Sequence, residues 1–160
     1  MSTMGTLTVA FLGDIFASPG RSIVRERLPQ LREAYAPDLI IANAENARSG
    51  SGLSPALYRK LRDMGIDGMT LGDHCFRDGS IVSILEDPNE PIARPANLAD
   101  RAAGVRMLRL GPVGAAGRSV FVITVLGRVF FPLPADDPFA TVDAMLADLP
   151  ERNPIVIVEA

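Results

Sequence analysis

Cysteine, histidine and tryptophan are almost missing from this chain of 160 residues, which has one cysteine, one histidine and no tryptophan. With Cys75 alone, no disulfide can form within the chain, which is typical of a reducing compartment, so we expect a cytoplasmic protein. No run of 18 or more apolar residues occurs, so no membrane-spanning helix is expected. The short, uncharged segment 1–5 does not resemble a signal peptide.

An excess of basic residues is also missing, because 16 Lys and Arg stand against 19 Asp and Glu, for a net charge of −3. This balance argues against duplex nucleic acid or an anionic membrane surface as a partner. The apolar content of 48% is sufficient for a hydrophobic core, and the length suggests a single domain over residues 1–160.

The order of apolar and helical patterns predicts an α/β fold. Buried strands are predicted at 7–12, 39–42, 69–71 and 155–158, and a β-hairpin at 105–110 and 118–125 around a glycine-rich turn at 111–117. Helices are predicted at 20–35, 54–65, 78–86 and 137–149. Ser18 is a possible N-cap of the first helix, and Pro29 should kink or split it.

Polar side chains follow three consecutive predicted strands. Asp14 follows the first strand, Glu45 and Asn46 the second, and Asp73 and His74 the third. The intervals of about 30 residues suit strand–helix–strand units. Because parallel strands joined by right-handed crossovers point their carboxyl ends to one edge of the sheet, we expect these five side chains to share one crevice.

Three carboxylates in one crevice repel one another, by about 4 kcal/mol for a pair about 4 Å apart at an effective dielectric constant near 20. A bound cation is the simplest relief, and carboxylate and amide oxygens with one imidazole favour Mn²⁺, Fe²⁺, Mg²⁺ or Zn²⁺. Two such ions could bind a phosphoryl group and generate a hydroxide nucleophile, while His74 stabilises the pentavalent phosphorus or protonates the leaving oxygen. Arg94 and Arg128 are candidates for holding phosphate oxygens.

Each of these residues also has a structural alternative. Asp14 could form a turn or cap the following helix, a single histidine is more often structural than catalytic, and an arginine can simply be solvated. The repetition at three strand ends is what favours a site. A nucleophilic Cys75 is disfavoured, because no second histidine is present to act as its base and neighbouring carboxylates would raise its pKa.

Six segments, spread over nearly the whole chain, match the sequence pattern of a known protein family in the same order. They are Phe11–Asp14 with Pro19–Arg21, Ile41–Asn46, Thr70–His74, Arg94–Asn97, Gly127–Phe130 and Asp136–Phe139. With these segments the chain resembles the YmdB-like, calcineurin-type metallophosphoesterases of bacteria. The resemblance implies a sandwich of two mixed β-sheets flanked by helices. It also implies a metal-dependent phosphodiesterase that hydrolyses cyclic nucleotides or related phosphodiesters through a metal-bound hydroxide.

The same resemblance implies a role for each site residue. The ligands of two divalent ions (Fe, Mn, Zn or Mg) would be Asp14, Glu45, Asn46 and Asp73. His74 would be the catalytic histidine. Apart from these roles, we predict substrate contacts at Arg94, Asn97 and Arg128.

The chain departs from the family pattern in three places. Asp73 stands where the family has Asn, and Leu126 stands where the family usually has a polar residue. The family's remaining metal-binding histidines would follow Ala160. We therefore expect an N-terminal portion of a longer protein, apparently truncated at the C-terminus, with about half of the metal shell and little or no activity by itself.

Two other functions stay open at this point. The first is a degenerate homologue without catalytic activity that binds a nucleotide or a protein. The second is a nucleotide-binding α/β domain without metal. A homo-oligomer is also possible, because the exposed end of the last strand could promote association, which would then be an artefact of truncation.

Overall fold

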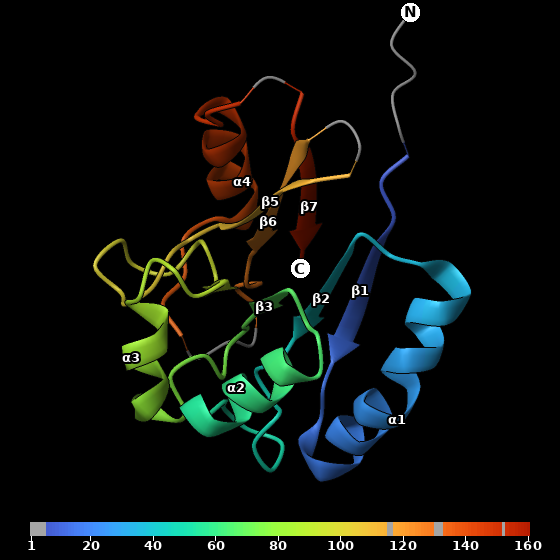
Figure 1. Ribbon diagram of the computed structural model, residues 1–160. Coiled ribbons are helices and arrows are strands. Elements are labelled where there is room, and N and C mark those ends of the chain that lie inside the picture. The colour runs from blue at the N-terminus through green and yellow to red at the C-terminus, as the bar shows by residue number, and fades with distance from the viewer. Residues whose placement is uncertain (1–5, 115–116, 130–132, 152) are drawn as a thin grey trace, which may run out of the picture.

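The computed structural model describes residues 6–114, 117–129, 133–151 and 153–160. These residues form two β-sheets stacked on each other, with helices on both outer faces (Figure 1). The predicted α/β sandwich is therefore confirmed. The expectations for residues 1–5, for positions 115–116 of the hairpin turn and for Phe130 fall outside the described residues.

The first sheet contains four parallel strands in the order β1-β2-β3-β4. Their bounds are β1 Val9–Asp14, β2 Leu39–Asn43, β3 Gly68–Thr70 and β4 Ile92–Ala93. The crossovers contain α1 Ala17–Tyr35, α2 Pro55–Asp63, and a 3-10 turn Gly79–Ile81 that continues into α3 Val82–Leu85. Every residue of β2 is buried, as expected for a parallel strand that is covered on both faces.

Helix α1 begins earlier than the sequence predicts. It starts at Ala17, its N-cap is Phe16, and no side chain caps it, so the prediction of Ser18 as the N-cap is wrong. The Ala17 amide donates instead to the carbonyl of Asn46 at 2.9 Å, which ties the helix start to the loop after β2. Pro29 lies inside a continuous helix and does not split it.

Two other helices begin at residues whose side chains cap them. Ser54 accepts a hydrogen bond from the Leu57 amide at the start of α2, and Asp137 accepts one from the Ala140 amide at the start of α4. Helix α4 spans Pro138–Ala147, slightly shorter than predicted. These side chains satisfy amides that the first helical turn leaves unpaired.

The second sheet contains three strands in the order β5-β6-β7, with bounds β5 Leu108–Val113, β6 Arg118–Thr124 and β7 Ile155–Glu159. Strands β5 and β6 form the predicted antiparallel hairpin, and β7 pairs with β6 in parallel. Figure 1 shows α4 beside this sheet and α1, α2 and α3 around the first sheet.

The alternation of apolar side chains along the strands explains the stacking of the sheets. In β2, Leu39 and Ile41 pack in the cluster between the two sheets, whereas Ile40 and Ala42 pack in the cluster that includes the helical residues. In β6, Val120 and Val122 join the cluster between the sheets, and Ile123 packs with side chains of α4. Each sheet thus packs apolar side chains on both of its faces. No described helix is long and apolar enough to cross a membrane.

Candidate metal centre

The carboxyl ends of the first three strands lie at one edge of the first sheet. Asp14 is the last residue of β1 and pairs with Asn43, the last residue of β2. The segment after β2 is held against the neighbouring strands, because the Ile15 amide donates to the Asn43 carbonyl and the Ala44 amide donates to the Thr70 carbonyl, both at 3.0 Å. The structure thereby brings the polar segments that follow β1, β2 and β3 to the same edge.

A chain of side-chain hydrogen bonds connects three of the predicted site residues. The Asn46 amide group donates to Asp14 at 3.0 Å, and the Asn46 Oδ1 atom lies 2.5 Å from Nδ1 of His74. Because an ionised carboxylate only accepts hydrogen bonds, Asn46 must turn its NH₂ to Asp14 and its oxygen to His74. In this arrangement Nδ1 of His74 donates to Asn46, which leaves Nε2, on the side of Asp73, as the ring nitrogen that could bind a proton or a metal.

Glu45, Asp73 and His74 form a compact group of potential metal ligands. One ligand atom of each lies within 4.8 Å of the ligand atoms of the other two. Nε2 of His74 is 3.6 Å from an Asp73 carboxylate oxygen, and the backbone amide of His74 donates to Glu45 at 2.9 Å. Asp14 is not in this group, but Asn46 connects it to His74.

The electrostatics of Glu45 agree with a site that would take a cation. Burial raises the pKa of the Glu45 carboxyl above its usual value, the hydrogen bond from the His74 amide opposes this shift, and the charges of Asp73 and Asp14 add to it. A divalent cation among these carboxylates would remove the repulsion. Oxygen ligands with one imidazole nitrogen are a suitable donor set for such an ion.

Because Gly72 has no side chain, the Glu45 carboxylate can lie directly against it. A Cβ atom at residue 72 would lie 2.5 Å from both Glu45 carboxylate oxygens and 2.6 Å from Cδ. Real Cβ atoms are essentially never found this close to another heavy atom. An alanine before Asp73 would therefore require the end of the Glu45 side chain to move away from its observed position.

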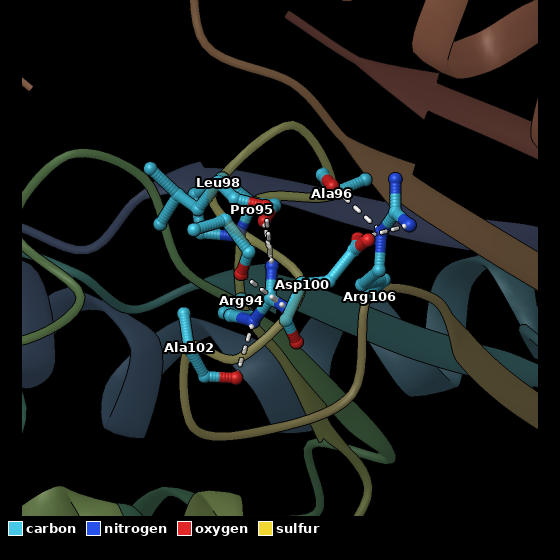
Figure 2. A network of polar contacts seen from close by, with 8 residues as sticks. Arg94, Pro95, Ala96, Leu98, Asp100, Ala102 and Arg106 are labelled. Carbon is cyan, nitrogen blue, oxygen red and sulfur yellow. Dashed lines mark hydrogen bonds and ion pairs between the residues drawn. The ribbon is translucent and has the colours of Figure 1, made fainter. Parts of the chain in front are cut away.

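Arg94, predicted to contact substrate, is instead buried and fully occupied inside the protein (Figure 2). Its five N–H donors match five hydrogen bonds of 2.8–3.4 Å to backbone carbonyls; the acceptors are Pro95, Leu98, Ala99, Asp100 and Ala102. Burial, and then the nearby Arg106, lower the pKa of Arg94. These contacts favour a structural role, since no donor is left for a phosphate.

Asn97 also has contacts that favour a structural role over the predicted contact with substrate. It is completely buried, its NH₂ donates to the carbonyls of Leu126 and Asp136, and its Oδ1 accepts from the Leu126 amide.

Arg128 differs, because it is exposed and lines a groove of about 610 Å³ with Phe139 and other residues near the end of β7. Of the three predicted substrate contacts, Arg128 is the one with an exposed side chain.

Two residues at this edge were not predicted as site residues. Asn43 ends β2 and Glu159 ends β7, and the Asn43 amide group donates to Glu159 at 2.8 Å. Asn43 is within the segment singled out in the sequence, and Glu159 follows an apolar strand as Asp14 does, so the same pattern could have identified both.

Cys75 is buried, and its pKa is raised to about 12 by burial and by Glu45, which agrees with the expectation that it is not a nucleophile.

The sequence matches proteins of one family over almost its full length. The model of the family described as "YmdB-like protein" matches residues 10–160. A 2',3'-cyclic-nucleotide 2'-phosphodiesterase of Bacillus subtilis is 36% identical over 154 residues, which are 96% of this chain and 56% of that protein. A putative phosphatase/phosphodiesterase of Mycoplasma genitalium is 40% identical over 96 residues, which are 59% of this chain and 34% of that protein.

Two solved structures have the same fold. The structure of a novel phosphatase from Mycoplasma pneumoniae has a TM-score of 0.84 and 27% identity, and the match covers 98% of this chain and 56% of the other. A hypothetical protein from Thermus thermophilus has a TM-score of 0.82 and 37% identity, with 96% and 59% covered. The chain thus spans little more than half the length of these structures. With a family match over residues 10–160 and this shared fold, the chain belongs to the YmdB-like protein family.

Proposed function

We propose that this chain is part of a metal-dependent phosphodiesterase that hydrolyses cyclic nucleotides or related phosphodiesters. The observation that carries the proposal is the group formed by Glu45, Asp73 and His74 at the carboxyl edge of the first sheet. The printed activity of the Bacillus subtilis relative, on 2',3'-cyclic nucleotides, supports the choice of substrate.

Glu45, Asp73, Asp14 and Asn46 would hold two divalent ions, with Fe, Mn, Zn and Mg as the candidate metals. When bound, such ions neutralise phosphoryl charge and lower the pKa of a water molecule that attacks phosphorus. The carboxylates of this chain would keep the ions at the strand ends. The side-chain oxygen of Asn46 connects their site to the imidazole of His74.

His74 would act on the leaving oxygen of the phosphodiester. Its Nδ1 proton faces Asn46, so the ring has a fixed orientation and its Nε2 is available for a proton. A protonated Nε2 can donate this proton as the phosphorus–oxygen bond breaks, which is general acid catalysis. Arg128, which is exposed, is the remaining candidate among the predicted contacts for a phosphate oxygen.

The test measures hydrolysis of 2',3'-cyclic AMP under single-turnover conditions with Mn²⁺, so that even slow cleavage is detected. The Bacillus subtilis relative serves as the positive control. In line with the little or no activity expected from the sequence, we expect at most slow product formation, which should require Mn²⁺ and fall at least about a hundredfold in His74→Ala, because general acid catalysis typically contributes 10²–10⁴-fold.

Two results would contradict the proposal. Equal rates in the wild type and in His74→Ala would remove the histidine from the mechanism. Binding of the cyclic nucleotide that is equally strong with and without Mn²⁺ would remove the metal from the site and would support the alternative of a nucleotide-binding domain without metal. We also propose a cytoplasmic location, supported by the single buried cysteine, and leave homo-oligomer formation to a measurement of mass in solution.

A further inference from the structure

Beside the candidate metal centre, Glu159 connects the carboxyl end of β2 in the first sheet with the carboxyl ends of β6 and β7 in the second sheet. It is the last residue of β7, and it pairs with Thr124 at the end of β6. One carboxylate oxygen accepts from the Asn43 amide group at 2.8 Å, and the other accepts from the Thr124 hydroxyl at 2.7 Å. Asn43 and Thr124 are both buried and Glu159 is half-buried, so these contacts are partly shielded from water.

The contact with Glu159 fixes the orientation of the Asn43 side chain. Because a carboxylate only accepts hydrogen bonds, Asn43 must direct its NH₂ to Glu159 and its oxygen to the other side. There the oxygen accepts from the backbone amide of Glu45 at 3.1 Å. A connected series of hydrogen bonds therefore runs from the second sheet to the backbone of a candidate metal ligand.

The Glu45 backbone sets where its carboxylate can reach. That carboxylate accepts from the His74 amide at 2.9 Å and fits over Gly72 with no spare room. A small rotation of the Glu45 backbone would move the carboxylate out of the group that it forms with Asp73 and His74.

We propose that Glu159 is a positioning residue for the metal centre: through Asn43, it holds the Glu45 backbone in the orientation that places the Glu45 carboxylate among the metal ligands. The inference rests on the proposed function, because it requires Glu45 to bind metal. Partners that orient metal ligands typically contribute 10–100-fold to metal affinity, which gives the size of the expected effect.

The test compares Mn²⁺ affinity, measured by isothermal titration, among folded variants. Glu159→Ala should weaken Mn²⁺ binding at least about tenfold, because it releases Asn43. Glu159→Gln should remain close to the wild type, since its amide can still accept from Asn43 and donate to Thr124. Tyr58→Phe is the matched control. It also removes a partly buried hydrogen bond, to Glu90, but Glu90 precedes β4 and so lies at the opposite strand ends from the candidate metal centre.

The outcomes distinguish a positioning role from a purely structural one. A loss in Glu159→Ala, with near-normal affinity in Glu159→Gln and Tyr58→Phe, supports the inference. Unchanged affinity in Glu159→Ala overturns it. An equal loss in Glu159→Gln also overturns it, because the charge of residue 159 rather than its hydrogen bond would then matter.

A second measurement separates this inference from the metal centre itself. If the wild type binds no Mn²⁺, the proposed metal centre fails, and the metal-free ¹H–¹⁵N spectrum still reports on the hydrogen bonds. In that spectrum, Glu159→Ala should shift the Glu45 amide signal and speed its hydrogen exchange, whereas Glu159→Gln should not. An unchanged Glu45 amide in Glu159→Ala would overturn the inference without any reference to metal.

Discussion

Replacing Gly72 by alanine should disrupt the candidate metal centre through a single methyl group. The added Cβ would lie 2.5 Å from both carboxylate oxygens of Glu45, so either this side chain or the backbone of residue 72 must move. Overpacking of this kind typically costs 1–3 kcal/mol, and a lost hydrogen bond to a charged group about 1.5–3 kcal/mol. Because the colliding atoms are the end of a flexible side chain, the carboxylate can move aside, and the expected cost of about 2 kcal/mol comes mainly from losing the hydrogen bond that it accepts from the His74 amide.

The assay combines thermal unfolding with Mn²⁺ titration. For a chain of this size, about 2 kcal/mol corresponds to a decrease of roughly 4–8 °C in Tm. Mn²⁺ affinity should fall at least about tenfold, because the displaced carboxylate leaves the group of ligands. Gly13→Ala is the matched control: it is next to Asp14 at the same edge, and its Cβ would meet no atom within 4 Å.

A double variant identifies the cause of the effect. If the added methyl group collides with the Glu45 carboxylate, Gly72→Ala should cost much less stability in a protein that already carries Glu45→Ala. An unchanged Tm and metal affinity in Gly72→Ala would refute the close approach described above. An equally large loss of stability in the Glu45→Ala background would refute the carboxylate as its cause.

Three further predictions concern single side chains. Because burial and Glu45 raise the pKa of Cys75 to about 12, the thiol should react with Ellman's reagent at pH 8 only as fast as the protein unfolds, and immediate labelling would contradict this. Arg94→Lys should lower the free energy of unfolding by about 3 kcal/mol in urea titrations, since Lys has three donors for the five carbonyls that Arg94 binds; full stability would argue against the network in Figure 2. Hydrogen bonds from Ser80, with a contribution from Arg48, lower the pKa of Asp78 in the folded protein. The ionised carboxylate therefore stabilises the folded protein at pH values above its unfolded-state pKa of about 3.9, and this stabilisation is lost as the pH falls through the folded-state pKa. The Tm difference between the wild type and Asp78→Asn should therefore shrink between pH 6 and pH 2, and a constant difference would contradict the assignment.

The strands and the meeting of their ends were predictable from local patterns. Apolar runs of the right length, separated by helical patterns, indicated β1, β2, β3 and the β5–β6 hairpin, and parallel connections require their carboxyl ends to meet. The position of polar residues directly after three strands therefore predicted that those residues would lie close together. Their hydrogen bonds and ligand distances agree with that geometry, whereas metal binding remains a proposal.

Other features depend on contacts that no local pattern reveals. Strand β4 has two residues between prolines, too few for a periodic signal. Arg94 was predicted to hold phosphate oxygens because its guanidinium suits them, and no local pattern reveals that the backbone of residues 95–102 turns around it and supplies five acceptors. The link between Asn43 and Glu159 joins positions 116 residues apart and exists only once the sheets are stacked.

The most direct test of this account is to locate Mn²⁺ in crystals of the chain by anomalous diffraction. The account predicts an anomalous peak at the carboxyl edge of the first sheet, within coordination distance of Glu45 and Asp73. Crystals soaked with Mn²⁺ that show no peak there, or a peak only at other carboxylates on the surface, would contradict the claim that these strand ends form a metal centre.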